Sequence, residues 1–361
     1  MQSSRTPSQT AAAIATTAAS ADTAARAEAL RYSFLSCLFL TAQNGFGQDV
    51  EPFLALSRET WGEEQLWDAV KDLPHGRLRR EGPAPQHAAG PFGFELGPFS
   101  AGRTHVMYAA QAGAVARLRW LIARGARLEL KDWKGRTALL WASREGRVEA
   151  VRELLARGAA VGTANNDGET PLFIASWSGH LEMVRELLAR GAAVDTANNN
   201  GATPVYIASS EGHLEVVREL LARGAAVDTA TNLGATPLFI ASQYGHLEVV
   251  RELLARGAAV DTAPHNDGYT PLYVASEEGH LEVVRELLAR GAALDAAAKY
   301  GFTPLLIASR NGHLEVARTL LARGANPRLT TRGGSSALSL ATAKGHAAVV
   351  QLLKTVLAAA Y

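Results

Sequence analysis

The chain contains a single cysteine, Cys37, among its 361 residues. One thiol cannot form an intramolecular disulfide, and it supplies too few soft ligands for a structural zinc site. A reducing compartment is compatible with this composition but does not follow from it. Cys37 falls in an apolar segment typical of a helix, which favours an inert buried thiol over a reactive nucleophile.

No stretch of the sequence approaches the roughly 18 consecutive apolar residues that a membrane-spanning helix requires. An excess of one charge is missing too, because 36 basic residues face 35 acidic ones and leave a formal net charge of +1. A chain balanced in this way has no overall field that would attract nucleic acid or an anionic membrane surface. We therefore expect no nucleic acid and no membrane among its partners.

The common catalytic motifs are also missing. The sequence has no Gly-x-x-x-x-Gly-Lys phosphate loop, no His-Glu-x-x-His metal pair and no cysteine pair. Gly90, Gly93 and Gly97 do not fit a dinucleotide-binding fingerprint. We therefore expect a protein that is not an enzyme, with no cofactor, no metal site and no small-molecule substrate.

What the sequence does contain is an internal repeat. A glycine recurs at steps of 33 residues, with one step of 34 that comes from an extra residue near Pro264. A second glycine follows each of these by eleven residues, and a third glycine recurs at the same period. A fixed period of this length is the signature of a repeat architecture. The first series is Gly102, Gly135, Gly168, Gly201, Gly234, Gly268, Gly301 and Gly334.

One unit shows how these residues build local structure. Thr170 can cap a helix by accepting a hydrogen bond from a backbone N–H, and Pro171 suits the first helical position. A short buried helix should follow and end at Gly179, and a second, amphipathic helix should end at a left-handed Gly191. Residues 194–200 are rich in turn formers and should project as a loop. One such unit buries too little apolar surface to fold alone, so the units must stack.

The strings TPLFIASWSGHLEMVRELLARGAAVDTANNNG and TPLYVASEEGHLEVVRELLARGAALD closely resemble the ankyrin repeat. The resemblance covers residues 102–361 and implies an all-α solenoid of eight stacked helix-turn-helix repeats with hairpin loops. It also implies that the concave helix face and the loop tips bind proteins. The sequence departs from the family where a histidine usually stands two residues after the proline, and this departure predicts a stickier, more apolar inner surface. The residues at that position are Phe173, Tyr206, Phe239, Tyr273 and Leu306.

The chain is predicted to have three parts. Residues 1–24 are rich in Ala, Ser and Thr and are predicted to be a disordered tail. Residues 25–101 are predicted to form a short helical region, with helices over 25–43 and 57–72, followed by a linker rich in Gly and Pro over 73–101. The repeats are predicted at 102–134, 135–167, 168–200, 201–233, 234–267, 268–300, 301–333 and 334–361.

Trp120 suggests a role for the N-terminal region. The equivalent position holds glutamate in the next five repeats, so a tryptophan there would be exposed unless another segment covers it. We hypothesise that the N-terminal helices cover Trp120 and cap the stack. The alternative is a lone exposed tryptophan.

Two recurring side chains invite a functional interpretation, but their spacing favours a structural one. Adjacent repeats should lie roughly 10 Å apart, so neighbouring histidines cannot share a zinc ion at about 2.0 Å from each nitrogen. They are predicted to be hydrogen-bonding turn residues. Arginines such as Arg190 and Arg223 alternate with glutamates at helix C-termini, which favours a solvated structural face over an anion site. The histidines are His180, His213, His246, His280, His313 and His346.

Differences among the repeats separate the scaffold from the surface. Positions identical in every unit set the stack, whereas variable positions can carry specificity or reflect neutral drift among duplicated units. The variable positions cluster around the first glycine and just before the second. Tryptophan, tyrosine and arginine dominate the energetics of protein interfaces. The predicted protein-binding residues are Trp133, Arg136, Arg144, Trp177, Glu211, Tyr244, Tyr269, Glu277, Tyr300, Phe302 and Arg310.

These observations favour a monomeric, cytoplasmic scaffold that holds another protein against its concave face and loop tips. A substrate adaptor of a ubiquitin ligase is an alternative, since ankyrin arrays often follow a short helical docking module. Residues 25–72 are long enough for such a module, although they show no clear F-box signature. An enzyme housed in residues 25–101 is a third interpretation. A nuclear location and an organelle transit peptide at the N-terminus also stay open.

Overall fold

The computed structural model describes residues 89–90, 94–95, 103–123, 125–263 and 267–359. The described part of the chain is built from paired helices, which confirms the predicted all-α repeat fold. The predicted tail, the two predicted N-terminal helices and Cys37 lie outside the described residues. The cover predicted for Trp120 therefore also lies outside them.

The chain divides into two compact units. The first takes in residues 1–142 and 149–160, and the second takes in 143–148 and 161–361. The elements of the first are β1 (Ala89–Gly90), β2 (Phe94–Glu95), α5 (His105–Ala112), α6 (Val115–Ala123), most of α7 (Ala138–Arg144) and most of α8 (Val148–Ala156). Strands β1 and β2 form an antiparallel pair inside the predicted linker, with Ala89 opposite Glu95 and Gly90 opposite Phe94.

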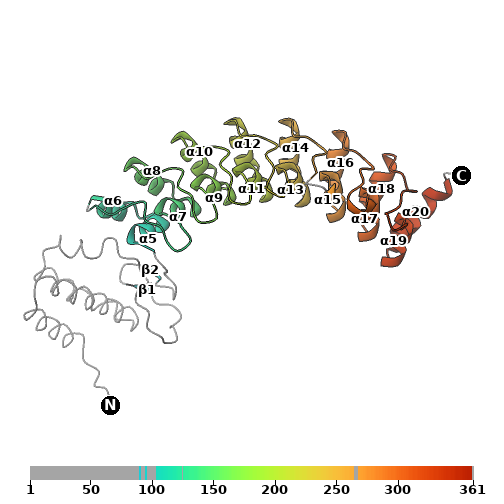
Figure 1. Ribbon diagram of the computed structural model, residues 1–361, viewed down its shortest axis with the longest axis horizontal. Coiled ribbons are helices and arrows are strands. Elements are labelled where there is room, and N and C mark those ends of the chain that lie inside the picture. Colours follow the sequence, from blue (N-terminus) through green and yellow to red (C-terminus); the bar gives the residue numbers. More distant parts are fainter. Residues whose placement is uncertain (1–88, 91–93, 96–102, 124, 264–266, 360–361) are drawn as a thin grey trace, which may run out of the picture. The chain divides into compact units, whose positions relative to one another are not determined.

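The second unit consists of two rows of helices (Figure 1). Each inner helix packs on the next inner helix and on the outer helix that follows it in the chain. The inner helices are α9 (Pro171–Trp177), α11 (Pro204–Ser210), α13 (Pro237–Gln243), α15 (Pro271–Glu278), α17 (Pro304–Asn311) and α19 (Ala337–Lys344). The outer helices are α10 (Leu181–Ala189), α12 (Leu214–Ala222), α14 (Leu247–Ala255), α16 (Leu281–Ala289), α18 (Leu314–Ala322) and α20 (Ala347–Ala359), and a 3-10 turn, η2 (Lys299–Gly301), precedes α17.

Each inner helix begins at the predicted cap. The hydroxyl of Thr170 accepts a hydrogen bond from the backbone N–H of Phe173 at 3.2 Å, and Pro171 occupies the first turn. Helix α9 ends at Trp177, two residues before the predicted stop, because Ser178 already serves as its C-terminal cap. Gly191 follows α10 in the left-handed conformation, as predicted.

The core of the second unit lies between the two rows. Leu172 of α9 and Val184 and Leu187 of α10 are fully or almost fully buried, and the equivalent residues recur in the following repeats. Burying a leucine side chain contributes about 2 kcal/mol. Since these side chains reach their burial only between neighbouring repeats, the stack and the core form together.

Most of the apolar side chains that replace the family histidine belong to this packing. Phe173 is 3% exposed, Tyr273 4% and Leu306 1%, and Tyr206 and Phe239 are half-buried. The prediction of a stickier inner surface was therefore wrong at the three buried positions. Phe239 packs against the cluster around Tyr273 in the adjacent repeat.

Carboxylates tie four consecutive hairpins of the second unit to the next repeat. The side chain of Asp228 accepts a hydrogen bond from the backbone N–H of Ala259, at 3.1 Å to the nearer oxygen. Asp195, Asp261 and Asp295 make the same link to the repeats that follow them. Gly162 occupies the equivalent position in the preceding repeat, so this link is missing there.

Restoring the missing carboxylate should stabilise the second unit. Gly162 does not have positive φ, and a Cβ built on it meets no atom within 4 Å. Gly162→Asp should therefore accept from the backbone N–H of Ala193 and raise the free energy of unfolding by about 1 kcal/mol. Urea denaturation followed by circular dichroism measures the change. The matched loss, Asp228→Gly, should lower stability by a similar amount or more, and an unchanged midpoint for both variants would contradict the role of the link.

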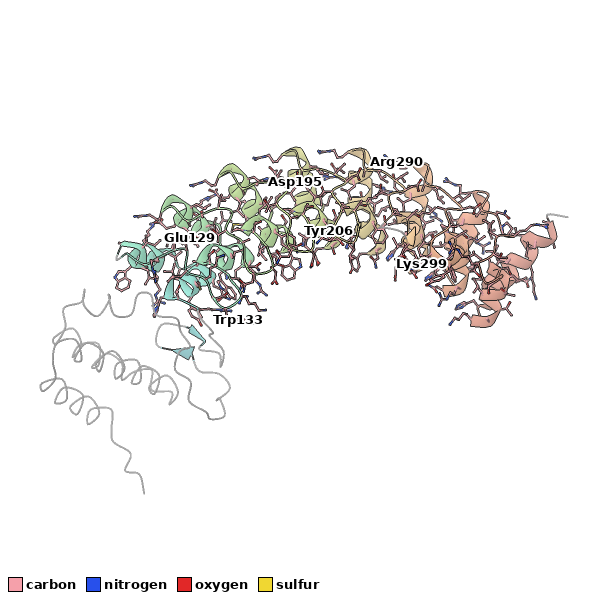
Figure 2. All side chains as sticks on the ribbon, viewed as in Figure 1. Glu129, Trp133, Asp195, Tyr206, Arg290 and Lys299 are labelled. Carbon is pink, nitrogen blue, oxygen red and sulfur yellow. The ribbon has the colours of Figure 1, made fainter. Side chains whose placement is uncertain are left out.

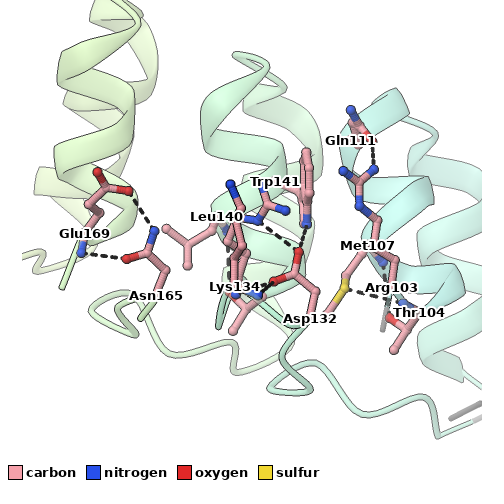
Figure 3. Close-up of polar contacts among 12 residues, drawn as sticks. Arg103, Thr104, Met107, Gln111, Asp132, Lys134, Leu140, Trp141, Asn165 and Glu169 are labelled. Atoms are coloured by element: carbon pink, nitrogen blue, oxygen red, sulfur yellow. Dashed lines mark hydrogen bonds and ion pairs between the residues drawn. The ribbon is translucent and has the colours of Figure 1, made fainter. Parts of the chain in front are cut away.

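In the first unit a buried carboxylate organises the hairpin before α7 (Figure 3). The side chain of Asp132 accepts from the backbone N–H groups of Lys134 and Arg136, each at 2.9 Å. It also accepts from Nε of Arg136 at 2.9 Å and from Nε1 of Trp141 at 3.2 Å. The guanidinium groups of Arg103 and Arg136 lie 3.5 and 4.0 Å from the centre of the Trp141 ring. One buried side chain therefore fixes the turn, the arginine and the indole together.

Candidate functional site

The exposed residues of the inner row gather where the inner helices end. Trp177 is the last residue of α9, and Glu211 and Tyr244 directly follow α11 and α13. The side chains of Trp177 and Tyr244 are 41% and 55% exposed, and Glu211 is exposed. Consecutive inner helices pack on one another, so these residues lie on one continuous face, which we call the inner face. Figure 2 shows Tyr206 and Lys299 on the side of the inner helices and hairpins, and Arg290 on the opposite side, with the outer helices.

Histidines from the following repeat hold the backbone of this face. Nε2 of His213 lies 3.0 Å from the carbonyl oxygen of Trp177, and Nε2 of His313 lies 2.8 Å from that of Glu277. A carbonyl can only accept, so Nε2 must carry the hydrogen. The same bond joins His180 to Arg144, His246 to Ser210, His280 to Gln243 and His346 to Arg310. The predicted turn role of the histidines is confirmed, and four of their acceptors are residues of the predicted binding set.

The hairpin tips supply a second group of candidates. Tyr300 is 59% exposed and has a φ of 63°, a backbone conformation that costs a tyrosine about 1–2 kcal/mol. Its carbonyl accepts from the backbone N–H of Arg332 at 2.8 Å, which helps to hold it in place. Beside it, Nζ of Lys299 lies 2.7 Å from a carboxylate oxygen of Asp267, and this hydrogen bond raises the pKa of Lys299. A strained and exposed aromatic residue at a loop tip is a reasonable interface anchor.

Tyr269 and Phe302 are placed differently from the other aromatic candidates. Both are half-buried and pack on the cluster around Tyr273, and the rings of Tyr269 and Tyr273 are 4.9 Å apart. Burial raises the pKa of Tyr273 above its ordinary value. The guanidinium of Arg310 lies 5.6 Å from the Phe302 ring. These two residues therefore shape the surface by packing.

Glu277, at the end of α15, is half-buried beside this cluster, whereas its neighbour Glu278 is exposed. Burial, and then the charge of Glu278, raises the pKa of Glu277, and the opposite charge of Arg310 lowers it. Sequence reasoning selected Glu277 and passed over Glu278. The signal that separates them is their distance from the second glycine, because the residue directly before that glycine is also exposed in the two preceding repeats, at Glu211 and Tyr244.

The first unit contains two further candidates, of which one is exposed and the other is engaged within the fold. Trp133 is 61% exposed on its hairpin, and Nζ of Lys134 lies 5.0 Å from the centre of its ring. Arg136 is engaged with Asp132 and Trp141, and its side chain is 14% exposed. Of this pair, Trp133 is the side chain available to a partner.

The outer helices present paired charges. Nε of Arg218 lies 3.0 Å from Glu252 of the next repeat, and another of its nitrogens lies 2.8 Å from Glu215 of its own helix. The same pattern recurs at Arg251, and Arg190 pairs with Glu186 as the sequence predicted. The charged side chains that line a shallow groove along this side pair with one another; the lining residues are Arg218, Glu248, Arg251, Glu252, Ala255, Glu286 and Arg290. The prediction of a solvated structural face is confirmed for the outer row.

No three His, Cys, Asp or Glu side chains among the described residues come together as metal ligands. Within the same residues, no helix combines the length and the apolar character needed to cross a bilayer.

Comparison with known proteins agrees with the repeat architecture. The family model for ankyrin repeats, in three copies, matches residues 92–165, 150–231, 190–264, 219–299, 258–331 and 294–358. A similar solved structure is the human ASB11 ankyrin repeat domain, which is 32% identical, with a TM-score of 0.58. The match covers 62% of this chain and all of that one. A search of the curated proteins found no match.

Proposed function

Because this chain belongs to the ankyrin-repeat family, whose arrays serve as protein-interaction scaffolds, we propose that it binds a partner protein through the inner face and the adjoining hairpin tips. The observation that supports this site is the exposure of large aromatic side chains on a backbone held by the histidine bonds. Exposed aromatic residues on a fixed backbone lose little conformational freedom on binding and bury a large area.

We assign the contact to the exposed members of the predicted set. In the second unit these are Trp177, Glu211, Tyr244, Tyr300 and Arg310, and Arg144 extends the same row. Trp133 is a candidate on the first unit. Tyr269, Glu277 and Phe302 support this surface through packing, and Arg136 supports the hairpin of Trp133.

The substrate-adaptor alternative depends on the N-terminal helical region, which lies outside the described residues. Proximity labelling in the native cell with the full chain and with residues 102–361 would separate partners of the array from partners of that region. Ligase subunits labelled only by the full chain would support the adaptor role.

Replacing Trp177 and Tyr244 together with alanine should weaken capture of the array's partners at least tenfold, since truncating a central aromatic anchor commonly costs more than 1 kcal/mol. Quantitative pull-down of the partners found by proximity labelling measures the effect. The control is Glu215→Ala with Glu248→Ala, which changes exposed side chains on the outer helices of the same unit. Partners retained equally by both double variants would place the contact elsewhere.

A further inference from the structure

The inner face of the central repeats differs in charge from the rest of the second unit. Between residues 161 and 298, every lysine and arginine lies on an outer helix or is the residue that caps one. Each of those arginines is paired with a glutamate of its own outer helix or of the next one. The inner helices and hairpins of this stretch carry acidic residues and no lysine or arginine.

Most of these acidic side chains already form a hydrogen bond or an ion pair within the fold, or are partly buried in it. Asp195, Asp228, Asp261 and Asp295 each accept a backbone hydrogen bond from the following repeat. Glu169 accepts from Nδ2 of Asn165 at 2.7 Å, Asp267 pairs with Lys299, and Glu277 is half-buried near Arg310. Glu211 and Glu278 are exposed on the inner face, and within the part of the chain that the structure describes their side chains form no hydrogen bond or ion pair.

Glu211 and Glu278 flank an exposed aromatic residue. Glu211, Tyr244 and Glu278 occupy the same position in three consecutive repeats, directly before the second glycine. Tyr244 is 55% exposed and lies near the half-buried Tyr206, whose pKa is raised by burial and by that neighbouring phenol. The row therefore alternates between a carboxylate, an aromatic ring and a carboxylate, and each of these groups attracts a cation.

The repeat spacing sets the register of a chain lying along this row. Packed helices lie about 8–10 Å apart, and an extended chain advances about 3.3 Å per residue. One repeat step therefore corresponds to about three residues of an extended peptide. In the next repeat the equivalent position holds Asn311, which is preceded by the exposed Arg310, so the cation-attracting row ends there.

Resting on the proposed function, we propose that the partner presents an extended basic segment, with lysine or arginine about every third residue, that binds along Glu211, Tyr244 and Glu278. The segment runs across the ends of α11, α13 and α15. Trp177 adds an apolar contact at one end of the row, and Arg310 repels a further cation at the other.

The test uses the full chain and a short fluorescein-labelled peptide with arginine at every third position and glycine and serine between. Fluorescence anisotropy should show binding that weakens as salt is raised. Glu211→Gln with Glu278→Gln should weaken binding about fivefold to tenfold, because two exposed charge pairs are lost at up to about 1 kcal/mol each. The control, Glu215→Gln with Glu248→Gln, makes the same change in net charge on the outer helices and should alter the affinity less than about twofold.

Three results would overturn this inference. They are no binding of the spaced peptide, equal loss in the two double variants, and equal binding of a peptide of the same composition with its arginines adjacent. If cellular partners still depend on Trp177 and Tyr244 while the spaced peptide does not bind, the proposed function stands and only the basic segment is rejected.

Discussion

Asp132→Ala should destabilise the first unit by about 3–4 kcal/mol, because it removes the acceptor shared by a turn, an arginine and a buried indole. The Asp132 side chain is fully buried, and Trp141 is 3% exposed. Removing one member of a buried charge pair leaves the other uncompensated, which typically costs 3–5 kcal/mol. Arg136 can reach solvent through its partly exposed side chain, which keeps the loss at the lower end. Urea denaturation and hydrogen exchange over residues 103–160 measure the effect.

A graded series distinguishes the network from a general loss of charge. Asn165 and Asn198 accept the same pair of backbone N–H bonds at the equivalent positions of later repeats. Asp132→Asn should therefore keep the turn and lose the contacts to Arg136 and Trp141, at an intermediate cost of about 2 kcal/mol. Glu149→Ala, which removes a carboxylate that is 70% exposed in the same unit, should cost less than 1 kcal/mol. An asparagine variant as stable as the wild type would show that the turn alone matters, and equal losses from the alanine and asparagine variants would show that the contacts to Arg136 and Trp141 alone matter.

Gly245→Ala should destabilise the second unit by about 2–3 kcal/mol. Gly245 has a φ of 74°, and a Cβ added there would lie 2.5 Å from Nδ1 of His280. Left-handed strain costs about 1–2 kcal/mol, and moving the imidazole breaks its 2.9 Å bond to the carbonyl of Gln243, which costs about 1 kcal/mol more. Thermal unfolding followed by circular dichroism measures the loss.

Gly257→Ala is the matched control for this prediction. Gly257 has a φ of 87°, and a Cβ there meets no atom within 4 Å. Its cost should be the strain alone, about 1–2 kcal/mol. If the two variants unfolded at the same temperature, the close approach between Gly245 and His280 would not limit stability.

Much of the fold could be predicted because the same capping, turn and core residues recur in several repeats. The cap at Thr170, the left-handed Gly191 and the ion pair between Glu186 and Arg190 are local features, set by residues at most four positions apart. The turn role of the histidines also followed, because the distance between repeats excluded the metal alternative. The order of the helices could be predicted from the 33-residue period alone.

The candidate site was harder to predict because exposure depends on neighbours that are distant in the sequence. Tyr269 and Tyr300 both look like hairpin aromatics, yet Tyr269 packs on Tyr273 while Tyr300 stands in solvent. Arg136 was chosen as an interface arginine, although the partners that engage it, Asp132 and Trp141, are set by the turn and the following helix. The apolar replacements of the family histidine were assigned to the surface for the same reason. Variation among repeats locates a surface but does not show which side chains reach it.

The histidine bonds bear on how such arrays could be recombined. The carbonyl of Trp177 is held by His213, which belongs to the following repeat. If a single repeat, bounded by its first glycine and that of the next repeat, were grafted into another array, the graft would contain the tryptophan but not the imidazole that orients it. A segment suitable for grafting is therefore offset from the sequence period. It must extend through the next Gly-His pair if the grafted side chain is to keep its orientation.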